Sequence, residues 1–434
     1  MKPMFIVSCP IDTYSGYGAR SRDFVKALIE LDKYDVKILP QRWGQTPWGF
    51  IKNHPEWEFL NLHLLPVGNQ LPKQPEIWCQ ITVPNEFQPI GKYNIGLTAG
   101  IENTACDSSW IEGCNRMDLN LVSSEHSKEI FQHIRFTKMD QRTNQPVGEI
   151  FIQKPVEVLF EGIDLTKYFP SKEKPLIDLS EIKESFVYLF VGHWMQGIIG
   201  EDRKNVGLLV KSFYETFKNQ KKTPALILKT SGAGASYLDR EYILNNIHQV
   251  RSTIEADTLP NVYLLHGEFS DKEINSLYNN PKVKAMVNFT KGEGFGRPLL
   301  EFSLVNKPII TTKWSGHTDF LDSKFTTLIN GELTNVHESA AVKNMILKEG
   351  KWFSLNVQQA SQYLQDMFVN YKNYEKGAKL QYHKSKNNFS FEKMKETMSN
   401  TFDIYVPDFP EEIKLELPKL NLPKLKKLED ESAK

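Results

Sequence analysis

The stretch Lys291-Gly292-Glu293-Gly294-Phe295-Gly296-Arg297-Pro298-Leu299-Leu300-Glu301 encloses a glycine-rich turn between two glutamates with seven residues between them. Upstream, 283–289 is apolar and β-prone, which predicts a buried parallel strand, and 298–306 predicts a helix start. Such a turn presents backbone N–H groups to an anionic or hydroxyl-rich ligand. A plain connection with solvated acids is the default interpretation of a lone Gly-x-Gly. The two carboxylates favour a ligand that carries hydroxyls.

Composition limits the class of protein. With 434 residues the chain is too long for one ordinary core and predicts two domains. Its 40% hydrophobic and 24% charged residues are typical of a globular protein. Lys plus Arg equals Asp plus Glu at 53 each, so bulk charge attracts neither nucleic acid nor an anionic bilayer, although it leaves room for a local basic patch.

The four cysteines, Cys9, Cys79, Cys106 and Cys114, have no C-x-x-C spacing and form no metal-type pattern with the histidines. A reduced intracellular protein is the simplest interpretation. The apolar run within residues 1–10 is too short for a signal-peptide core. No window of the sequence approaches the ~18 apolar residues of a membrane span. We therefore expect a cytoplasmic enzyme without an anchor of its own.

Strands alternate with helices along both halves of the chain. In the first half we expect strands at 4–8, 35–39, 77–82, 93–99, 119–122 and 156–159, and helices at 20–31, 108–114 and 124–131. In the second half we expect strands at 186–191, 225–229, 262–265 and 283–289, and helices at 206–217, 240–255 and 271–277. This alternation predicts an α/β protein with two Rossmann-like doubly wound domains that face each other across a ligand-binding cleft.

The predicted organisation is an N-terminal domain over 1–170, a charged linker over 171–184, a second domain over 185–388, a terminal helix over 389–406 and a tail over 407–434. The tail repeats Leu-Pro-Lys-Leu units, whose prolines break a regular helix. A mobile tail is the first interpretation, and a docking peptide for a protein or a membrane surface is the second. Mixed lysines and acids there count against a polybasic anchor.

The run from Glu293 to Glu301 resembles the Glu-x7-Glu signature of the family-four retaining glycosyltransferases of the GT-B fold. The strand expected at 306–312 and the loop 314–320 resemble the family's following strand and its Ser-Gly-x-x-Asp-Phe loop. The segment 160–170 resembles the Gly-Val-Asp…Phe-x-Pro segment that closes the first domain. In the resembled fold the terminal helix crosses back toward that domain.

The resemblance implies a nucleotide-sugar donor and a metal-independent reaction with retention at the anomeric carbon, so no metal or other cofactor is expected. It implies that Glu301 binds the ribose hydroxyls and Glu293 the sugar hydroxyls. The donor also contacts backbone N–H groups of the turn, which belong to Gly294, Phe295, Gly296 and Arg297.

Charge on a departing diphosphate requires cations. Arg203 and Lys204 directly precede a predicted helix, which makes an anion site, and they resemble the family's Arg-Lys-Asn or Lys-Gly element. Many members place an arginine after the glycine that ends the preceding strand, whereas here His193 stands in that position and Arg203 supplies the missing charge. Lys229, at the end of the next strand, is either a further phosphate contact or a structural lysine.

In the first domain, Gly16, Tyr17 and Gly18 resemble the family's first glycine loop, where the backbone approaches the donor phosphates. A plain turn is the default interpretation of that motif alone. Glu102, Asn103 and Thr104 follow a strand that faces the cleft in the resembled fold and are acceptor-site candidates. Asn85 and Glu86 are weaker ones.

Four aromatic residues follow the second strand: Trp43, Trp48, Phe50 and Trp57. Packing in a core or a lid is the first interpretation, and stacking on an acceptor is the second.

These observations predict a glycosyltransferase that moves a hexose-type sugar from a nucleotide-sugar donor to an acceptor hydroxyl. The acceptor is a glycan, a lipid-linked molecule or another hydroxyl compound, with protein and modified DNA left open. One alternative is a sugar epimerase on the same architecture, and the other is an inactive sugar-binding or scaffold protein. An intact set of Glu293, Arg203, Lys204 and Glu301 argues against an inactive copy.

Overall fold

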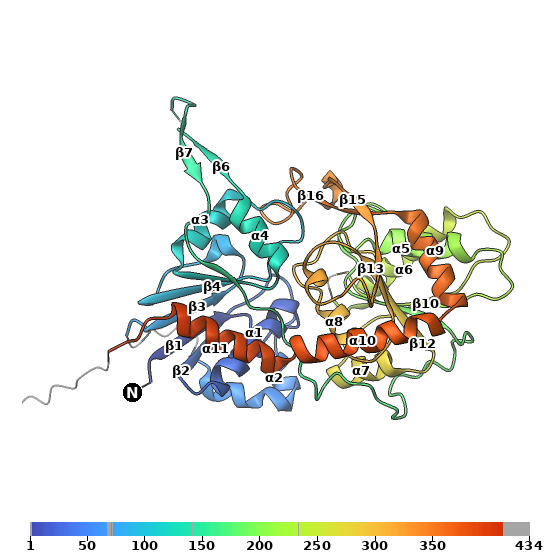
Figure 1. Cartoon of the computed structure of the whole chain (residues 1–434), viewed down its shortest axis with the longest axis horizontal. Coiled ribbons are helices and arrows are strands. Elements are labelled where there is room, and N and C mark those ends of the chain that lie inside the picture. The colour runs from blue at the N-terminus through green and yellow to red at the C-terminus, as the bar shows by residue number, and fades with distance from the viewer. Residues whose placement is uncertain (1, 67–70, 72, 141, 233, 411–434) are drawn as a thin grey trace, which may run out of the picture.

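The computed structural model describes residues 2–66, 71, 73–140, 142–232 and 234–410. Two lobes stand side by side, each built on its own sheet (Figure 1). The first sheet has the order β2-β1-β3-β4-β5-β8, with all neighbours parallel. Its strands are β1 (Met4–Cys9), β2 (Asp35–Pro40), β3 (Ile77–Ile81), β4 (Tyr93–Leu97), β5 (Leu119–Val122) and β8 (Val156–Val158).

The second sheet has the order β11-β10-β9-β12-β13-β14 and is also parallel throughout. Its strands are β9 (Val187–Val191), β10 (Ala225–Lys229), β11 (Val262–Leu265), β12 (Val283–Asn288), β13 (Ile309–Thr312) and β14 (Thr327–Ile329). Two parallel sheets with helices confirm the predicted fold class. The exact domain bounds stay a prediction.

The helices of the first lobe are α1 (Gly16–Glu30), α2 (Phe50–Asn53), α3 (Ser108–Arg116) and α4 (Glu125–His133), with 3-10 turns η1 (Pro55–His63) and η2 (Pro84–Glu86). The predicted start of the first helix at Arg20 is wrong. Ser15 caps α1, because its Oγ accepts a hydrogen bond from the Gly18 backbone N at 2.9 Å. Gly16, Tyr17 and Gly18 therefore form the first turn of a helix, not a loop.

The second lobe carries α5 (Val206–Phe217), α6 (Tyr237–Ser252), α7 (Asp271–Asn279), α8 (Arg297–Ser303), η3 (Gly316–Asp319) and η4 (Glu338–Ala340). Sequence reasoning placed α6 at 240–255. The helix begins earlier because Ser236 caps it, accepting a hydrogen bond from the Asp239 backbone N. Helices α9 (Val357–Val369), α10 (Lys372–Asn388) and α11 (Phe391–Tyr405) follow.

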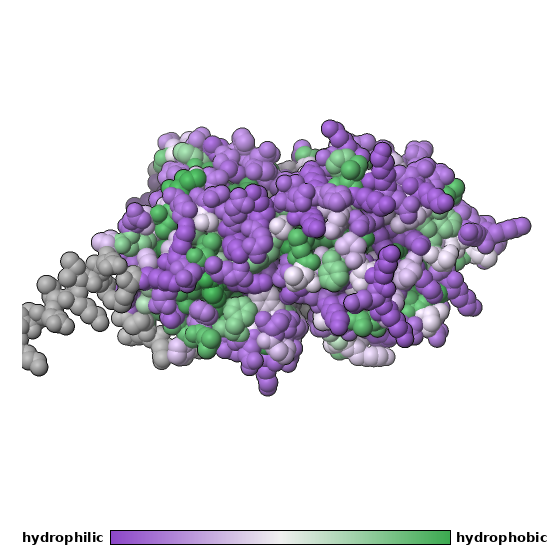
Figure 2. All heavy atoms as spheres, turned by 60° about the horizontal axis from the view of Figure 1, so that its bottom comes forward, coloured by the Kyte–Doolittle hydropathy of each residue, from purple (hydrophilic) through white to green (hydrophobic). Residues whose placement is uncertain are grey.

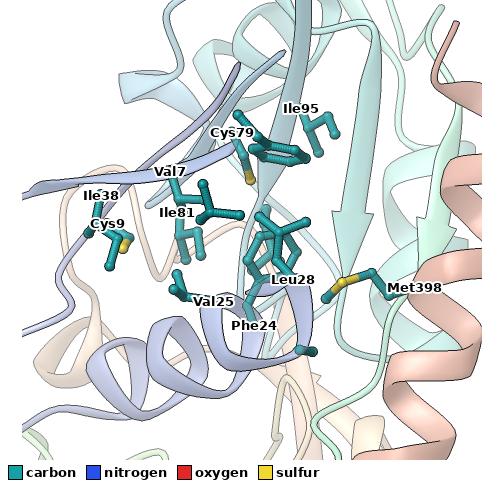
Figure 3. Packing of buried hydrophobic residues seen from close by; sticks show 14 of the residues in the cluster. Val7, Cys9, Phe24, Val25, Leu28, Ile38, Cys79, Ile81, Ile95 and Met398 are labelled. Atoms are coloured by element: carbon teal, nitrogen blue, oxygen red, sulfur yellow. The ribbon is translucent and has the colours of Figure 1, made fainter. Parts of the chain in front are cut away.

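Helix α11 returns to the first lobe, as expected (Figure 1). Met394, Met398 and Phe402 are buried in the same cluster as Phe24 of α1. Met398 reaches from α11 toward the strands and α1 in Figure 3. Two backbone hydrogen bonds anchor the return: Ile163 N donates to the Phe389 carbonyl oxygen, and the N of Phe391, the first residue of α11, donates to the Ile163 carbonyl oxygen. The predicted tail beyond residue 410 lies outside the described residues.

Two hairpins were not predicted. The hairpin β6 (Phe136–Met139) and β7 (Pro146–Ile150) rises from the first lobe with almost every residue half-buried or exposed (Figure 1). The hairpin β15 (Gly331–Asn335) and β16 (Lys351–Leu355) belongs to the second lobe. The β6–β7 strands bury little apolar surface and so carry a weak alternating pattern, whereas β16 buries Trp352, Phe353 and Leu355 without strict alternation.

The predicted linker over 171–184 has no helix or strand, yet it packs on the second lobe. Leu179 and Ile182 are buried in the core of that lobe. The Lys282 Nζ donates to the Leu179 carbonyl oxygen at 2.8 Å. The linker therefore covers part of a domain rather than spanning open solvent.

All four cysteines are buried and unpaired. No helix within the described part of the chain is both long and apolar enough to span a bilayer. The face that Figure 2 brings forward is mainly hydrophilic, with small hydrophobic patches between polar side chains.

Candidate functional site

The glycine-rich turn joins β12 to α8, as the sequence predicted. Gly296 has φ +96°, a left-handed conformation that glycine adopts readily, and it directly precedes α8. Pro298 lies in the first turn of the helix, where a missing N–H costs nothing. Glu293 lies in the turn and Glu301 lies in the helix, and both are almost fully buried.

Glu293 is held by two cations. The Lys204 Nζ lies 2.5 Å from Glu293 Oε1 and 2.6 Å from Oε2, and the Arg203 Nη1 lies 3.5 Å from Oε2. Burial opposes ionisation of Glu293, but Lys204 and Arg203 outweigh it and lower the pKa of Glu293 to about 2. The pair expected to face a diphosphate therefore neutralises a carboxylate in this structure.

Arg203 reaches both lobes. Its Nη1 donates to the Gly292 carbonyl oxygen at 2.9 Å, and its Nη2 lies 3.8 Å from Glu102 Oε1 of the first lobe. Burial alone would lower the pKa of Arg203, but Glu102 and Glu293 raise it. The structure thus brings together Glu102, expected on the acceptor side, and Arg203, expected on the donor side.

The two lobes touch along a seam that we define by residues 99–104 on one side and 292–294 and 350–351 on the other. A Cβ at Gly292 would lie 1.8 Å from the Glu102 carbonyl oxygen, and one at Gly294 would lie 2.4 Å from that of Ala99. Only glycine permits contacts this close.

Two further acceptor-site candidates lie on the same seam. The Thr104 backbone N donates to the Lys351 carbonyl oxygen at 2.9 Å, and the Lys351 N donates to Thr104 Oγ1 at 2.8 Å. Asn103 is buried against Gly350. The hairpin β15–β16, absent from the sequence predictions, supplies this half of the contact.

Glu301 lies in a second ion network. Its Oε1 accepts from Arg297 Nε at 3.0 Å, and its Oε2 accepts from the Tyr278 hydroxyl at 3.3 Å. Arg297 Nη1 also donates to Asp23 Oδ2 of α1 at 2.5 Å and lies 3.9 Å from Glu161. Burial, and to a lesser degree Asp271, raises the pKa of Glu301 to about 7 although Arg297 opposes the rise.

A cleft of about 470 Å³ lies between the lobes. Five predicted donor residues line it, namely Gly16, His193, Lys229, Arg297 and Glu301. The seam residues and the Glu293–Lys204 pair lie outside its lining. The structure therefore divides the predicted site into an open cleft and a closed seam.

His193 and Lys229 follow two neighbouring strands, β9 and β10, whose carboxyl ends meet at the cleft. His193 Nδ1 lies 3.1 Å from Ser231 Oγ, and burial together with Lys204 lowers the pKa of His193. The Lys229 Nζ donates to the Gly267 carbonyl oxygen at 2.8 Å and lies 5.0 Å from the Phe269 ring centroid. Burial lowers the pKa of Lys229.

Three other predicted donor residues, Tyr17, Gly18 and Phe295, lie outside the cleft lining. Tyr17 pairs its hydroxyl with Thr98 Oγ1 at 2.9 Å. A Cβ at Gly18 would lie 2.3 Å from the Thr13 carbonyl oxygen, so the turn needs glycine there. Phe295 is buried with its ring 5.1 Å from that of Phe320.

Several site residues were missed. Ser315 Oγ accepts from the Glu293 backbone N at 2.9 Å, and buried His317 donates Nε2–H to the Thr312 carbonyl oxygen at 2.7 Å. Both stand in the loop 314–320 that the sequence marked, so that motif was the available signal. No sequence motif marks Asp23 as a site residue, because it lies in α1, far from Arg297 in sequence.

A metal centre would need clustered ligands. No group of three His, Cys, Asp or Glu side chains within the described ranges is arranged to hold a metal ion. Metal independence stays a prediction of the resemblance.

No protein-family model and no curated protein matches the sequence. Solved structures match the fold. Anabaena HepE in complex with UDP and glucose has a TM-score of 0.61 at 13% identity, covering 92% of this chain and 99% of that one. Sucrose-phosphate synthase from Thermosynechococcus elongatus has a TM-score of 0.60 at 11% identity, covering 93% of this chain and 98% of that one. A glycosyltransferase from Rickettsia africae has a TM-score of 0.60 at 13% identity, covering 93% of this chain and 98% of that one.

The chain has the GT-B fold. Its two parallel-sheet α/β domains match these structures over more than nine-tenths of its length.

Proposed function

We propose that the protein is a nucleotide-sugar-dependent glycosyltransferase that moves a hexose-type sugar to an acceptor hydroxyl with retention and without a metal. The observation that carries the proposal is the position of Glu301 on the cleft wall, next to a seam that holds Glu293 between Lys204 and Arg203. Structures of the same fold hold UDP with glucose, or UDP-glucose. These ligands favour a uridine nucleotide as the first donor to test.

Each group of the donor has a partner in this proposal. The ribose hydroxyls donate to Glu301, and the sugar hydroxyls donate to Glu293. The diphosphate meets Lys204, Arg203 and Lys229 together with N–H groups at the start of α8. The bond from the anomeric carbon to the diphosphate breaks, the bond to the acceptor oxygen forms, and the acceptor hydroxyl proton passes to the departing diphosphate. The cations stabilise the charge that remains on the leaving group.

The charges around Glu293 link binding of the diphosphate to opening of the seam. In the closed seam, Arg203 and Lys204 face Glu293 and Glu102, so two positive charges meet two negative ones. Moving Glu102 away from Arg203 leaves one net positive charge beside Glu293. A diphosphate then enters a site with a favourable charge. Donor binding is thus linked to separation of the first lobe from the turn.

The acceptor side of the proposal rests on the seam residues Glu102, Asn103 and Thr104. Opening the seam exposes these three side chains next to the sugar site. A cytoplasmic location, and a contact of the tail with a membrane or a protein, belong to the same proposal.

The test is a panel of UDP, GDP and ADP and their glucose, galactose, mannose and N-acetylglucosamine derivatives, scored by thermal shift. One nucleotide class at 100 times its dissociation constant adds about 2.7 kcal/mol to stability. Release of nucleoside diphosphate from the bound sugar nucleotide, measured with and without a panel of hydroxyl acceptors, then separates transfer from epimerisation. No stabilisation by any member of the panel would refute the proposal.

A further inference from the structure

The four aromatic residues that follow the second strand differ in packing and exposure. Trp43 stacks on Tyr17 with ring centroids 3.9 Å apart, and Phe50 stacks on His54 at 3.8 Å. Trp57 is 6% exposed. Trp48 is 41% exposed, whereas Trp43 and Phe50 are half-buried, so Trp48 is the most exposed of the four rings.

The backbone around Trp48 is held firmly. Trp48 forms an antiparallel bridge with Thr13, and the Tyr14 N donates to the Pro47 carbonyl oxygen at 3.1 Å. The Gly49 N donates to the Asp12 carbonyl oxygen at 3.0 Å. Arg42 lies over the indole, with its Cζ 5.8 Å from the ring centroid. Trp48 is therefore a fixed platform rather than a loose surface side chain.

Trp48 lines a cavity of about 550 Å³ in the first lobe. This volume lies in the range of about 300–1,000 Å³ that is usual for ligand pockets. Aliphatic side chains line part of it, namely Pro40, Ile51, Leu64 and Leu65, and polar side chains complete it, namely Asp12, Lys52, Glu58 and Asn61. The cavity thus offers an aromatic face, carboxylates, an ammonium and an amide to one ligand.

We propose that this cavity is a subsite for a neutral glycan that serves as the acceptor. A pyranose ring has an apolar face, which packs on an indole, and hydroxyls around its rim, which need both hydrogen-bond donors and acceptors. Asp12 and Glu58 balance Lys52 and the neighbouring Arg42, so the charges around the indole cancel, which suits a neutral ligand. This inference rests on the proposed transferase function.

A glycan suits this surface better than a lipid. Helix α2 lies on the side of the molecule opposite the β6–β7 hairpin (Figure 1), and Figure 2 brings that side forward. Its hydrophobic patches are small and divided by polar side chains (Figure 2). A membrane-binding surface needs a larger continuous apolar area.

The cavity and the donor cleft flank one loop. Asp12 lines the cavity, whereas Tyr14, Ser15 and Gly16 line the cleft. Thr13, the bridge partner of Trp48, stands three residues before Gly16, and three residues span at most about 11 Å. An acceptor bound over Trp48 therefore needs only a few sugar units to bring one end to the cleft.

The test is binding of the full chain to an array of neutral oligosaccharides of one to six residues, with phosphorylated sugars and anionic phospholipid vesicles as the competing probes. We expect retention by a class of neutral oligosaccharides. Trp48→Ala should weaken it at least tenfold, and Trp48→Phe should keep most of it. The matched control is Phe59→Ala, since Phe59 is 37% exposed on η1 and lies outside the cavity lining.

Nucleotide binding separates this inference from the proposed function. Trp48→Ala should keep the wild-type thermal shift with the stabilising nucleotide, which also shows that the variant is folded. Equal glycan binding by wild type and Trp48→Ala, an equal loss in Phe59→Ala, or retention by vesicles or phosphorylated sugars alone would overturn the subsite. Failure of every nucleotide to stabilise the wild type would instead overturn the transferase assignment.

Discussion

Arg297, at the start of α8 in the second lobe, donates its Nη1–H to Asp23 Oδ2 on α1 of the first lobe at 2.5 Å. The same guanidinium donates Nε–H to Glu301 at 3.0 Å. Arg297, which the sequence assigned to the donor-binding turn, thus also links the two lobes by an ion pair. Glu301, the carboxylate assigned to the ribose, belongs to the same ion network.

Replacing Arg297 should destabilise the protein. Arg297→Gln removes the cation that faces Asp23, Glu161 and Glu301, all of them buried. Breaking a buried ion network by removing one partner costs about 3 kcal/mol or more, because the remaining charges lose their compensation. Urea unfolding measures the change in the free energy of unfolding. The control is Arg240→Gln, whose ion pair with Glu241 is exposed, and it should change stability by less than about 1 kcal/mol.

Glu293 should matter for both activity and stability. The sequence alone predicts that Glu293→Ala lowers kcat/KM by ~100-fold or more, a barrier change of about 2.7 kcal/mol, with folding nearly unaffected. The structure changes the second half of that expectation, because the substitution leaves buried Lys204 without its partner at 2.5 Å. The double variant Glu293→Gln with Lys204→Met should regain stability relative to Glu293→Gln alone and remain inactive. Unchanged turnover in Glu293→Gln would remove this residue from the site.

Arg297 and Glu293 show where sequence reasoning succeeds and where it stops. The strand, turn and helix around Glu293 follow from local periodicity and glycine chemistry, so the elements and their order were predictable. Pairing between side chains in different lobes depends on how two domains meet, which no local pattern encodes. For that reason the sequence did not predict the ion pair between Arg297 and Asp23 or the contact between Arg203 and Glu102.

The same distinction holds for α1 and for the hairpins. Ser15 is a helix cap in the structure, yet the glycines after it favoured a loop, because glycine lowers helix propensity. The β15–β16 hairpin has partners in the turn after β12, where Phe353 N donates to the Lys291 carbonyl oxygen at 2.9 Å, and in the first lobe, where Thr104 N donates to the Lys351 carbonyl oxygen. Tertiary contacts of this kind decide elements that local propensity leaves open.

Glu301 should make stability fall as pH rises toward neutrality. Its folded-state pKa of about 7 lies above the ordinary carboxyl value, so the folded state holds a proton that the unfolded state has released. The unfolded state therefore binds fewer protons between about pH 4.5 and pH 7, and this group lowers stability progressively across that window. Glu301→Gln removes the titrating group. Melting temperatures of both proteins from pH 4.5 to 8 test this, and a wild-type minus variant difference that stays constant would contradict it.

Lys204 should distinguish a diphosphate from a nucleoside. Lys204→Met removes a cation proposed to face the diphosphate, so it should weaken binding of the nucleoside diphosphate at least tenfold and leave binding of the free nucleoside within twofold. Isothermal titration of both ligands measures the ratio. Lys211→Met is the matched control, because Lys211 is exposed on α5, the helix that follows Lys204. Equal losses for the two ligands would show that Lys204 acts elsewhere.

The last prediction concerns the seam. A Cβ at Gly292 would lie 1.8 Å from the Glu102 carbonyl oxygen, a distance that real Cβ atoms do not reach, and the neighbour is backbone and so has little freedom to move away. Gly292→Ala should therefore hold the lobes apart while each lobe stays folded. We expect a larger radius of gyration by X-ray scattering, and tighter binding of the nucleoside diphosphate, because Arg203 is released from Glu102. The control is Gly234→Ala, where an added Cβ meets no atom within 4 Å. Unchanged scattering and unchanged nucleoside diphosphate binding in Gly292→Ala would contradict the link between seam opening and donor binding.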